Sequence, residues 1–196
     1  MSYYFVYKPF GMLSQFTQEQ AGQSTLADLH YTFPKDAYPV GRLDADSEGL
    51  LLISSDKTLN AKLLHPKHHA QKTYYVQVEG KPTALEIAPL QTGVVINVKG
   101  KPYRTAPAKV QLLETMPQLP PREPPIRFRK SIPDSWLSII LIEGKNRQVR
   151  KMCAALGFPV LRLVRVALEG YNLYQSPLLD MQSGEVRHFK QLTLKS

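Results

Sequence analysis

Cysteine is almost absent from this sequence. Cys153 is the single cysteine among 196 residues, so the chain can form no internal disulfide and no zinc site with several cysteine ligands. That usage is typical of a reducing compartment, and we expect Cys153 to be a small core residue. The histidines of "HPKHH" (His65 to His69) lie around a proline in a predicted loop and have no cysteine partner, so they predict no metal site.

Long apolar segments are missing as well. No stretch approaches the roughly 18 apolar residues that span a bilayer. The opening "MSYYFVYKPF" lacks the basic leader, apolar centre and cleavage site of a signal peptide. The sequence therefore predicts a soluble, intracellular protein of the cytoplasm that binds no membrane.

Acidic residues are scarce relative to basic ones. The chain has 25 Lys and Arg against 16 Asp and Glu, a formal charge of +9 and an isoelectric point near 9.6. This excess favours a polyanionic partner such as nucleic acid or anionic lipid, without choosing between them. A glycine-rich phosphate loop and a dinucleotide fingerprint are also lacking, which argues against the commonest nucleotide cofactor sites.

The chain does contain enough apolar residues for one folded domain. It is 43% hydrophobic and shows no repeat or low-complexity tail, which predicts a single domain over residues 1–196. Short strands and helices are expected to alternate along it. Strands are expected near residues 3–8, 50–53, 72–80, 94–98 and 108–114, and helices after the capping residues Ser24, Asp56 and Thr83.

A proline-rich segment follows, from Thr115 to Ser135. Proline lacks an amide donor and resists the helix interior, so the segment predicts a long loop or a polyproline stretch. It also carries four basic residues and an aromatic ring: Arg122, Arg127, Arg129, Lys130 and Phe128. Basic side chains bind phosphates and an aromatic ring stacks on unstacked bases, so this composition suits single-stranded or distorted RNA. A solvated linker explains the segment equally well.

Two further elements follow the proline-rich segment. "WLSIILIEG" predicts a strand that is apolar on both faces and hence central, and "NRQVRKMCAALG" predicts a helix capped by Asn146 and ended by Gly157. The first turns of this helix carry Arg147, Arg150 and Lys151, where acids are usually preferred. Positive side chains beside exposed amides would bind an anion, although an amphipathic helix with a basic outer face gives the same pattern.

Charges also surround a leucine-rich run in "GRLDADSEGLLLISSD", residues 41–56. Leu50 to Ile53 predicts a buried strand, so the loop before it should pack near the core, where charges need partners or a function. "DADS" is superficially similar to the aspartate pair of magnesium-dependent phosphatases. That pattern requires an apolar strand before the first aspartate, whereas here the apolar strand follows.

Three segments lie far apart in the chain: "KPFG" (Lys8 to Gly11), "GRLDADSEGLLLIS" (Gly41 to Ser54) and "EGKNRQVRKM" (Glu143 to Met152). In order and spacing they together resemble one family, the ribosomal pseudouridine synthases, which act on uridines of ribosomal RNA. "KTYYV" (Lys72 to Val76) and "GEVRHF" (Gly184 to Phe189) fit the same family. The chain is similar to its short branch, without the N-terminal RNA-binding module, and "PPIRFRKSIPDSW" (Pro124 to Trp136) resembles members that modify large-subunit RNA.

The resemblance implies that Asp44 is the nucleophile, and the chemistry supports this independently. Pseudouridine forms when the N1–C1′ bond breaks and C5 joins C1′, which needs no metal or redox cofactor. A carboxylate can add to the base or capture the sugar carbon. It must be ionised in a partly desolvated pocket, where a nearby guanidinium would lower its pKa. The resemblance assigns that guanidinium to Arg150, whereas Asp46 and Glu48 are expected to cap the loop or face solvent.

Other side chains receive binding roles. Strand alternation places Tyr74 with Val76 and Val78, pointing inward. By itself this predicts a core tyrosine, while the resemblance implies a pocket residue that stacks on uracil and could remove the C5 proton. Arg42 is expected to contact the RNA backbone or help expel the base. The full set expected to bind RNA is Arg42, Arg127, Arg129, Lys130, Lys145 and Arg147.

The resemblance implies an α+β fold, with a mixed, largely antiparallel sheet across two lobes, helices outside and a catalytic cleft between the lobes. Element alternation alone predicts only a mixed chain. The expected function is isomerisation of a specific uridine in ribosomal RNA, of the large subunit or its precursor particle, by a monomer. A ribosomal RNA-binding or assembly factor without catalysis, and an aspartate-nucleophile phosphatase that would need magnesium, are the alternatives.

Overall fold

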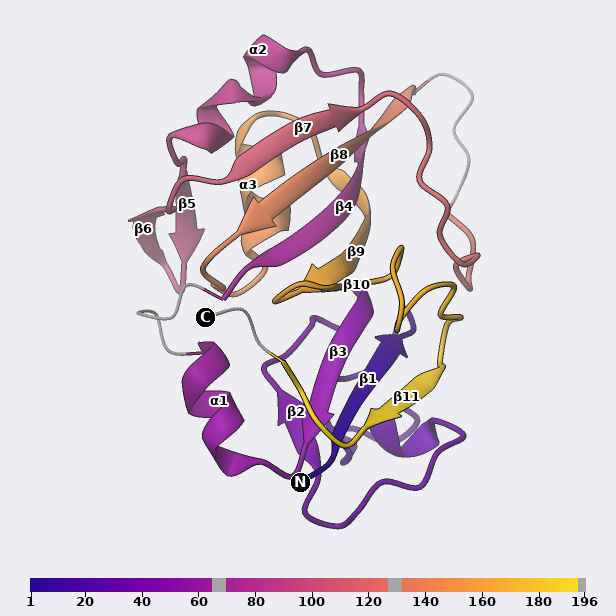
Figure 1. Cartoon of the computed structure of the whole chain (residues 1–196). Coiled ribbons are helices and arrows are strands. Elements are labelled where there is room, and N and C mark those ends of the chain that lie inside the picture. The colour runs from indigo at the N-terminus through magenta and orange to yellow at the C-terminus, as the bar shows by residue number, and fades with distance from the viewer. Residues whose placement is uncertain (65–69, 127–131, 194–196) are drawn as a thin grey trace.

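The computed structural model describes residues 1–64, 70–126 and 132–193 (Figure 1). Three of the residues predicted to bind RNA, Arg127, Arg129 and Lys130, lie outside the described residues, as do His65 to His69. In the described chain, no helix combines the length and the apolar character needed to cross a membrane.

Nine strands of the described chain form one sheet in the order β11-β1-β3-β9-β4-β8-β7, with β2 beside β3 and β10 beside β9. Their bounds are β1 (Tyr3–Lys8), β2 (Tyr38–Val40), β3 (Glu48–Ser54), β4 (Lys72–Glu79), β7 (Lys109–Leu113), β8 (Asp134–Leu141), β9 (Val160–Leu168), β10 (Tyr171–Asn172) and β11 (Val186–Phe189). All paired strands in it are antiparallel except β3 and β9. The predicted α+β fold with a mixed, largely antiparallel sheet is confirmed.

The sheet has two halves that meet at β3 and β9. One half contains β11, β1, β3 and β2 with α1 (Lys57–Leu64), and the other contains β9, β4, β8 and β7 with α3 (Gln148–Ala155) (Figure 1). Only two residue pairs join them in register, Glu48 with Val164 and Gly49 with Arg165. Gly49 has φ of 99°, and a Cβ there would lie 2.3 Å from the carbonyl oxygen of Arg165. Glycine is therefore required for this close approach.

Strand β3 is buried along its whole length. Leu51 and Ile53 pack into the apolar cluster on one face of the sheet, and Leu50 and Leu52 into the cluster on the other. The continuous apolar run follows from burial on both faces, and the predicted strand is confirmed. It gives a rigid base to the loop of residues 41–47 that enters it.

Strand β4 lies between β8 and β9 and shows the predicted alternation. Tyr74, Val76 and Val78 are buried, and the residues between them are partly exposed. The predicted strand in "WLSIILIEG" is β8, which ends at Leu141 and is paired on both sides, with β4 and with the edge strand β7, so it is an inner strand as predicted. Strand β9 was not predicted, because two arginines interrupt its apolar run; both of them are buried.

The helix starts follow local capping with two differences from the predictions. Asp56 accepts the backbone N–H of Thr58 at 2.9 Å before α1, and Thr83 forms a capping box with Glu86 at the start of α2 (Ala84–Ile87). Thr25, not Ser24, caps the short 3-10 turn Leu26–Asp28. Helix α3 begins at Gln148 because Arg147 occupies the N-cap in a left-handed conformation with φ of 51°, so the predicted cap at Asn146 was wrong.

A small hairpin completes the fold beside α3. It consists of β5 (Val95–Val98), which was predicted, and β6 (Lys101–Arg104), which was not. Strand β5 contacts α3, and a single 3-10 turn (Ala88–Gln91) connects α2 to the hairpin. Tyr103 of β6 reaches the space between the two halves of the sheet, where the candidate site lies.

Candidate active site

A cavity of about 880 Å³ opens between the two halves of the molecule. One wall is the loop before β3, with Arg42, Asp44 and Ser47, and the other consists of β4, β9 and the connection from β8 to α3. Its volume lies within the roughly 300–1,000 Å³ of small-molecule sites, enough for a single nucleotide. Five residues predicted for the site line it: Arg42, Asp44, Tyr74, Lys145 and Arg147.

A buried lysine fixes the loop that carries Asp44. Lys8, the last residue of β1, is fully buried, and its Nζ donates to the carbonyl oxygens of Met12 at 2.7 Å and Ala45 at 3.2 Å. The N–H of Gly11 also donates to Ala45, at 2.8 Å. Burial lowers the pKa of Lys8 to about 7. The "KPFG" segment thus holds the backbone immediately after Asp44.

Asp44 itself has an uncommitted side chain. It is half-buried in the cavity wall, and no described residue forms a hydrogen bond or ion pair with its carboxylate. Its backbone carbonyl accepts the N–H of Ser47 at 3.0 Å, which closes the loop into a turn. The carboxylate is therefore held in place through its backbone and remains open to a ligand in the cavity.

The arginines of α3 contact Asp46, two residues further along the loop. Arg147 donates to both carboxylate oxygens, at 2.9 and 2.7 Å. Arg150 donates through Nη2 to the carbonyl oxygen of Asp46 at 2.6 Å, and its Nε lies 3.3 Å from Oδ2. The ion pair that the resemblance implied for Asp44 thus falls on Asp46, and the expectation that Asp46 only caps the loop or faces solvent was wrong.

Charge nevertheless links Asp44 to these arginines. Burial lowers the pKa of Arg150, and the negative charges of Asp46 and then Asp44 oppose that shift. Burial alone would raise the pKa of Asp46, but the hydrogen bond from Arg147 and the charge of Arg150 hold it below its ordinary value. Asp46 stays ionised and ties the loop of Asp44 to α3.

Glu48 has a structural partner on the opposite face of the sheet. Its side chain is almost fully buried and accepts two hydrogen bonds from Arg162, at 2.9 and 2.7 Å. Arg162 also donates to the carbonyl oxygen of Pro120 at 2.7 Å, which anchors the proline-rich segment. The expectation that Glu48 caps the loop or faces solvent was wrong, because its partner lies 114 positions away in the sequence.

Tyr74 lies where alternation predicted it, buried and in the cavity wall. In the ladder between β4 and β9 it is opposite Arg165, which also lines the cavity. Lys72, on the same strand, donates to the carbonyl oxygen of Ala70 at 2.8 Å. Burial, and then the charge of Arg165, lowers the pKa of Lys72. Sequence reasoning missed both Lys72 and Arg165; a cation within an apolar strand was the available signal for Arg165.

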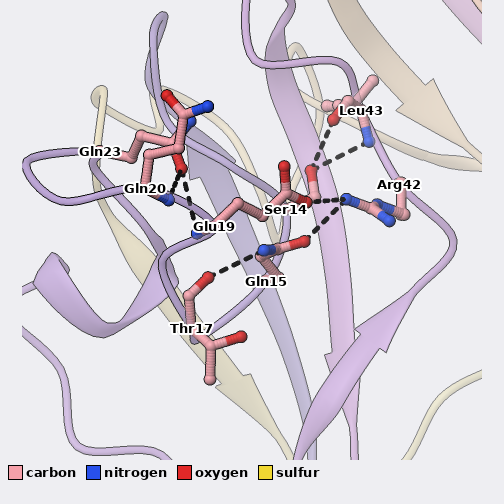
Figure 2. Close-up of polar contacts among 8 residues, drawn as sticks. All are labelled: Ser14, Gln15, Thr17, Glu19, Gln20, Gln23, Arg42 and Leu43. Carbon is pink, nitrogen blue, oxygen red and sulfur yellow. Dashed lines mark hydrogen bonds and ion pairs between the residues drawn. The ribbon is translucent and has the colours of Figure 1, made fainter.

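Arg42 is exposed and contributes to the lining of the cavity; Figure 2 shows its polar contacts. Its Nη2 donates to Oε1 of Gln15 at 2.8 Å and lies 3.9 Å from Oε1 of Glu19. The side chain of Gln23 accepts the N–H groups of Glu19 and Gln20, at 3.0 and 2.9 Å, and holds this turn. An exposed ion pair contributes about 0–1 kcal/mol, so Arg42 can exchange Glu19 for another anion at little cost.

Lys145 and a tyrosine of the hairpin close another side of the cavity. The Nζ of Lys145 lies 4.8 Å from the ring centroid of Tyr103, within reach of a cation–π interaction. The hydroxyl of Tyr103 donates to Glu143 at 2.7 Å, and Glu143 also accepts the N–H of Ala106 at 2.9 Å. Tyr103 was another cavity residue that sequence reasoning missed, because it lies on the unpredicted strand β6.

Comparison with known proteins agrees with this architecture. Residues 2–155 match the profile of the RNA pseudouridylate synthase family. The chain is 49% identical over 167 residues to ribosomal large subunit pseudouridine synthase E of Xanthomonas axonopodis pv. citri, covering 85% of each chain. It is 48% identical over 189 residues to the protein of the same name from Vibrio vulnificus, covering 96% of this chain and 74% of that one.

A solved structure gives the same result at the level of the fold. The crystal structure of a pseudouridylate synthase superimposes with a TM-score of 0.74 and 26% identity, over 97% of this chain and 71% of the other. A human RNA pseudouridylate synthase domain-containing protein superimposes with a TM-score of 0.58 at 17% identity, over 89% and 77% of the two chains, which shows the shared fold alone. The chain described here belongs to the RNA pseudouridylate synthase family.

Proposed function

We propose that the protein converts one uridine of large-subunit ribosomal RNA into pseudouridine, with Asp44 as the nucleophile. The observation that carries the proposal is the uncommitted carboxylate of Asp44 in a cavity that can hold a nucleotide. The choice of RNA is supported by relatives at 47–49% identity that are named ribosomal large subunit pseudouridine synthase E.

The target uridine must leave its stack to enter the cavity, which costs a few kcal/mol. Its uracil then lies between Asp44 and Tyr74, and the buried ring of Tyr74 stacks on it. Asp44 adds to C6 of the base or captures C1′ of the ribose, and the N1–C1′ bond breaks. The uracil turns, C5 joins C1′, and the bond to Asp44 breaks with its electron pair returning to the carboxylate. The C5 proton leaves and N1 gains a proton. The Tyr74 hydroxyl is our candidate for the group that accepts the C5 proton.

Basic residues around the rim supply the contacts to RNA. Among the described residues, Arg42 is tied only to neutral Gln15 and exposed Glu19, so a phosphate can replace Glu19. Lys145 lies at the opposite wall, next to Tyr103. Arg147 is already paired with Asp46, so its main contribution is to hold the loop of Asp44, and its RNA contact is secondary. Contacts through Arg127, Arg129 and Lys130 remain predictions, as do the monomeric state and the cytoplasmic location.

Ribosomal RNA transcripts give the direct test. The purified protein is incubated in excess with large-subunit and, separately, small-subunit transcripts, and pseudouridine is mapped by position. We expect conversion at one large-subunit uridine, with the same yield in the presence of a chelator. Strong binding without any conversion would support the non-catalytic alternative, and activity that chelator abolishes would contradict the proposed chemistry.

A further inference from the structure

Arg165 has a hydrogen-bond donor without an acceptor in the wall of the cavity. The residue is 4% exposed, and its Nε donates to the carbonyl oxygen of Leu50 at 2.7 Å. Its Nη2 is buried, lies in the described part of the chain and has no hydrogen-bond partner there. A buried donor left unpaired costs about 1–3 kcal/mol, and more when it is charged. The unliganded protein can bear this cost at a site where a bound ligand later supplies the missing acceptor.

The position of Arg165 directs it toward the place where a base would bind. It is opposite Tyr74 in the antiparallel ladder of β4 and β9, so the two side chains lie on the same face of the sheet. Leu163, two residues earlier on the same strand, also lines the cavity. The backbone of Arg165 lies close to Gly49, and the hydrogen bond from Nε to the carbonyl oxygen of Leu50 orients the buried guanidinium before any ligand arrives.

The other arginines around the site are already engaged. Arg147 and Arg150 both contact Asp46, and Arg162 is paired with Glu48 on the opposite face of the sheet. Among the arginines that the structure describes near Asp44, Arg165 is the one that lines the cavity and has a buried terminal nitrogen, Nη2, without a hydrogen-bond partner. Its free donor is therefore available for the substrate.

We propose that Nη2 of Arg165 donates to a carbonyl oxygen of the bound uracil and stabilises the negative charge that the base acquires during the reaction. This proposal rests on the proposed function of the same cavity. If Asp44 adds to C6, the electron pair of the C5–C6 double bond moves through C4 to O4. If Asp44 captures C1′, the N1–C1′ electron pair leaves with the base and is shared by N1, O2 and O4.

Both routes place negative charge on a carbonyl oxygen of uracil. When C5 bonds to C1′ that charge is withdrawn, and the bond from Asp44 to C6 or C1′ breaks and restores the carboxylate. The C5 proton leaves and N1 is protonated, so the isomerisation is balanced and Arg165 gains or loses no proton. A fixed, buried guanidinium suits this task, because a donor that is oriented in advance needs no reorganisation when the charge develops. Arg165 is thereby a further catalytic residue, whichever atom Asp44 attacks.

Two substitutions at Arg165 and one matched control test this role. Arg165→Gln removes the charge, and Arg165→Lys keeps it on a shorter donor. Arg162→Lys is the control, because it perturbs a buried arginine of the same strand on the face away from the cavity. At saturating protein, we expect Arg165→Gln to lower the single-turnover rate by about 100-fold, the order found when one such donor is removed. Arg165→Lys should recover part of the lost rate. The RNA affinity of both variants should stay within about three-fold of the unmutated protein, because the proposed contact of Nη2 is with the base and acts in the transition state.

Substrates with one altered carbonyl sharpen the test. Sulfur at position 2 or 4 of the target uracil is a weaker acceptor than oxygen and makes the base anion more stable. The rate deficit of Arg165→Gln should therefore shrink on 2-thiouridine or 4-thiouridine, and the altered position identifies the contacted oxygen. The Arg162→Lys control should respond to the thio-substrates as the unmutated protein does.

Two results would overturn the role of Arg165. One is a single-turnover rate for Arg165→Gln within three-fold of the unmutated protein, and the other is an equal deficit on uridine and on both thiouridines. If circular dichroism shows that Arg165→Gln is unfolded, Arg165→Lys is judged by the same thio-substrate criterion. Failure of the unmutated protein to form pseudouridine would instead contradict the proposed function, and the two failures are thus separable.

Discussion

Carboxylates and arginines lie on both faces of the sheet at β3 and β9, but in the described chain they are paired on one face and unpaired on the other. On the face away from the cavity, Glu48 and Arg162 are buried and bind each other through two hydrogen bonds. On the cavity face, Asp44 has no described partner and Arg165 has an unpaired donor. Pairing lets charges be buried within a stable fold. Charges held in place but left unpaired are available to a substrate.

In the described chain, paired and unpaired carboxylates also lie within five residues of one another, from Asp44 to Glu48. Glu48 is committed to the fold and Asp46 to the arginines of α3, whereas the contacts of Asp44 with the described part of the chain are made by its backbone. Carboxylates in one short segment therefore have three different tasks. Which task each performs depends on the partners that other elements bring to the loop.

Substitution of the uncommitted carboxylate should have the largest effect. Asp44→Asn keeps the shape of the side chain but cannot act as an anionic nucleophile, so we expect the single-turnover rate to fall by about 10⁴-fold or more, the order seen when a nucleophile is removed. RNA binding should survive, because phosphate contacts come from other residues. Pseudouridine yield and a binding titration on the same variant check this. A yield within a few-fold of the unmutated protein would exclude Asp44 as the nucleophile.

Removal of one committed partner should instead destabilise the fold. Glu48→Gln leaves the guanidinium of Arg162 buried without its counter-charge, and breaking such a pair costs about 3–5 kcal/mol. Urea unfolding measures the loss. The double variant Glu48→Leu with Arg162→Met removes both charges and should regain most of the stability. Equal stability of Glu48→Gln and the unmutated protein would mean that the pair is not a structural element.

Asp46 should show an intermediate effect on both properties. Asp46→Asn weakens the connection to Arg147 and Arg150, and we expect a rate about 10- to 100-fold lower, as for a misplaced catalytic group. The folded pKa of Asp46 lies below its ordinary 3.8. Its ion pairs therefore stabilise the fold above that pH and are lost as the pH falls through the lowered pKa. On acidification below pH 4, the free energy of unfolding of the variant should fall less than that of the unmutated protein. An identical pH dependence of the two unfolding free energies would contradict the ion pairs assigned to Asp46.

The rim of the cavity should respond least. Glu19→Gln frees Arg42 from an exposed ion pair that contributes about 0–1 kcal/mol, so RNA binding should tighten by only about two- to five-fold. Arg42→Gln should weaken binding by a similar factor, and the effect of Glu19→Gln should disappear in its presence. Independent effects of the two substitutions on the dissociation constant would show that Glu19 does not compete with RNA for Arg42.

The features that sequence could predict are local ones. The apolar run of β3, the alternation that buries Tyr74 and the capping box of Thr83 each depend on residues a few positions apart. The order of the strands in the sheet could not be obtained in the same way. β9 was missed because buried arginines interrupt its apolar pattern, and their partners lie on β3 and the proline-rich segment.

The site was predictable in its residue types but not in its pairings. Asp44, Tyr74 and Arg147, which the motifs singled out, line one cavity in the structure. The partners of Asp46 and Glu48 lie more than 100 positions away, so no local pattern could assign them. The left-handed N-cap at Arg147 was also unpredictable, since asparagine is the far commoner cap and non-glycine residues rarely adopt that conformation.

The most direct test of the account is to map pseudouridine across ribosomal RNA from three strains: one with the intact gene, one with the gene deleted, and one that carries only the Asp44→Asn form. We predict that one large-subunit position loses its pseudouridine in the deletion strain and in the Asp44→Asn strain, and that every other position is unchanged. An unchanged map in the deletion strain, or full modification restored by Asp44→Asn, would contradict the central claim.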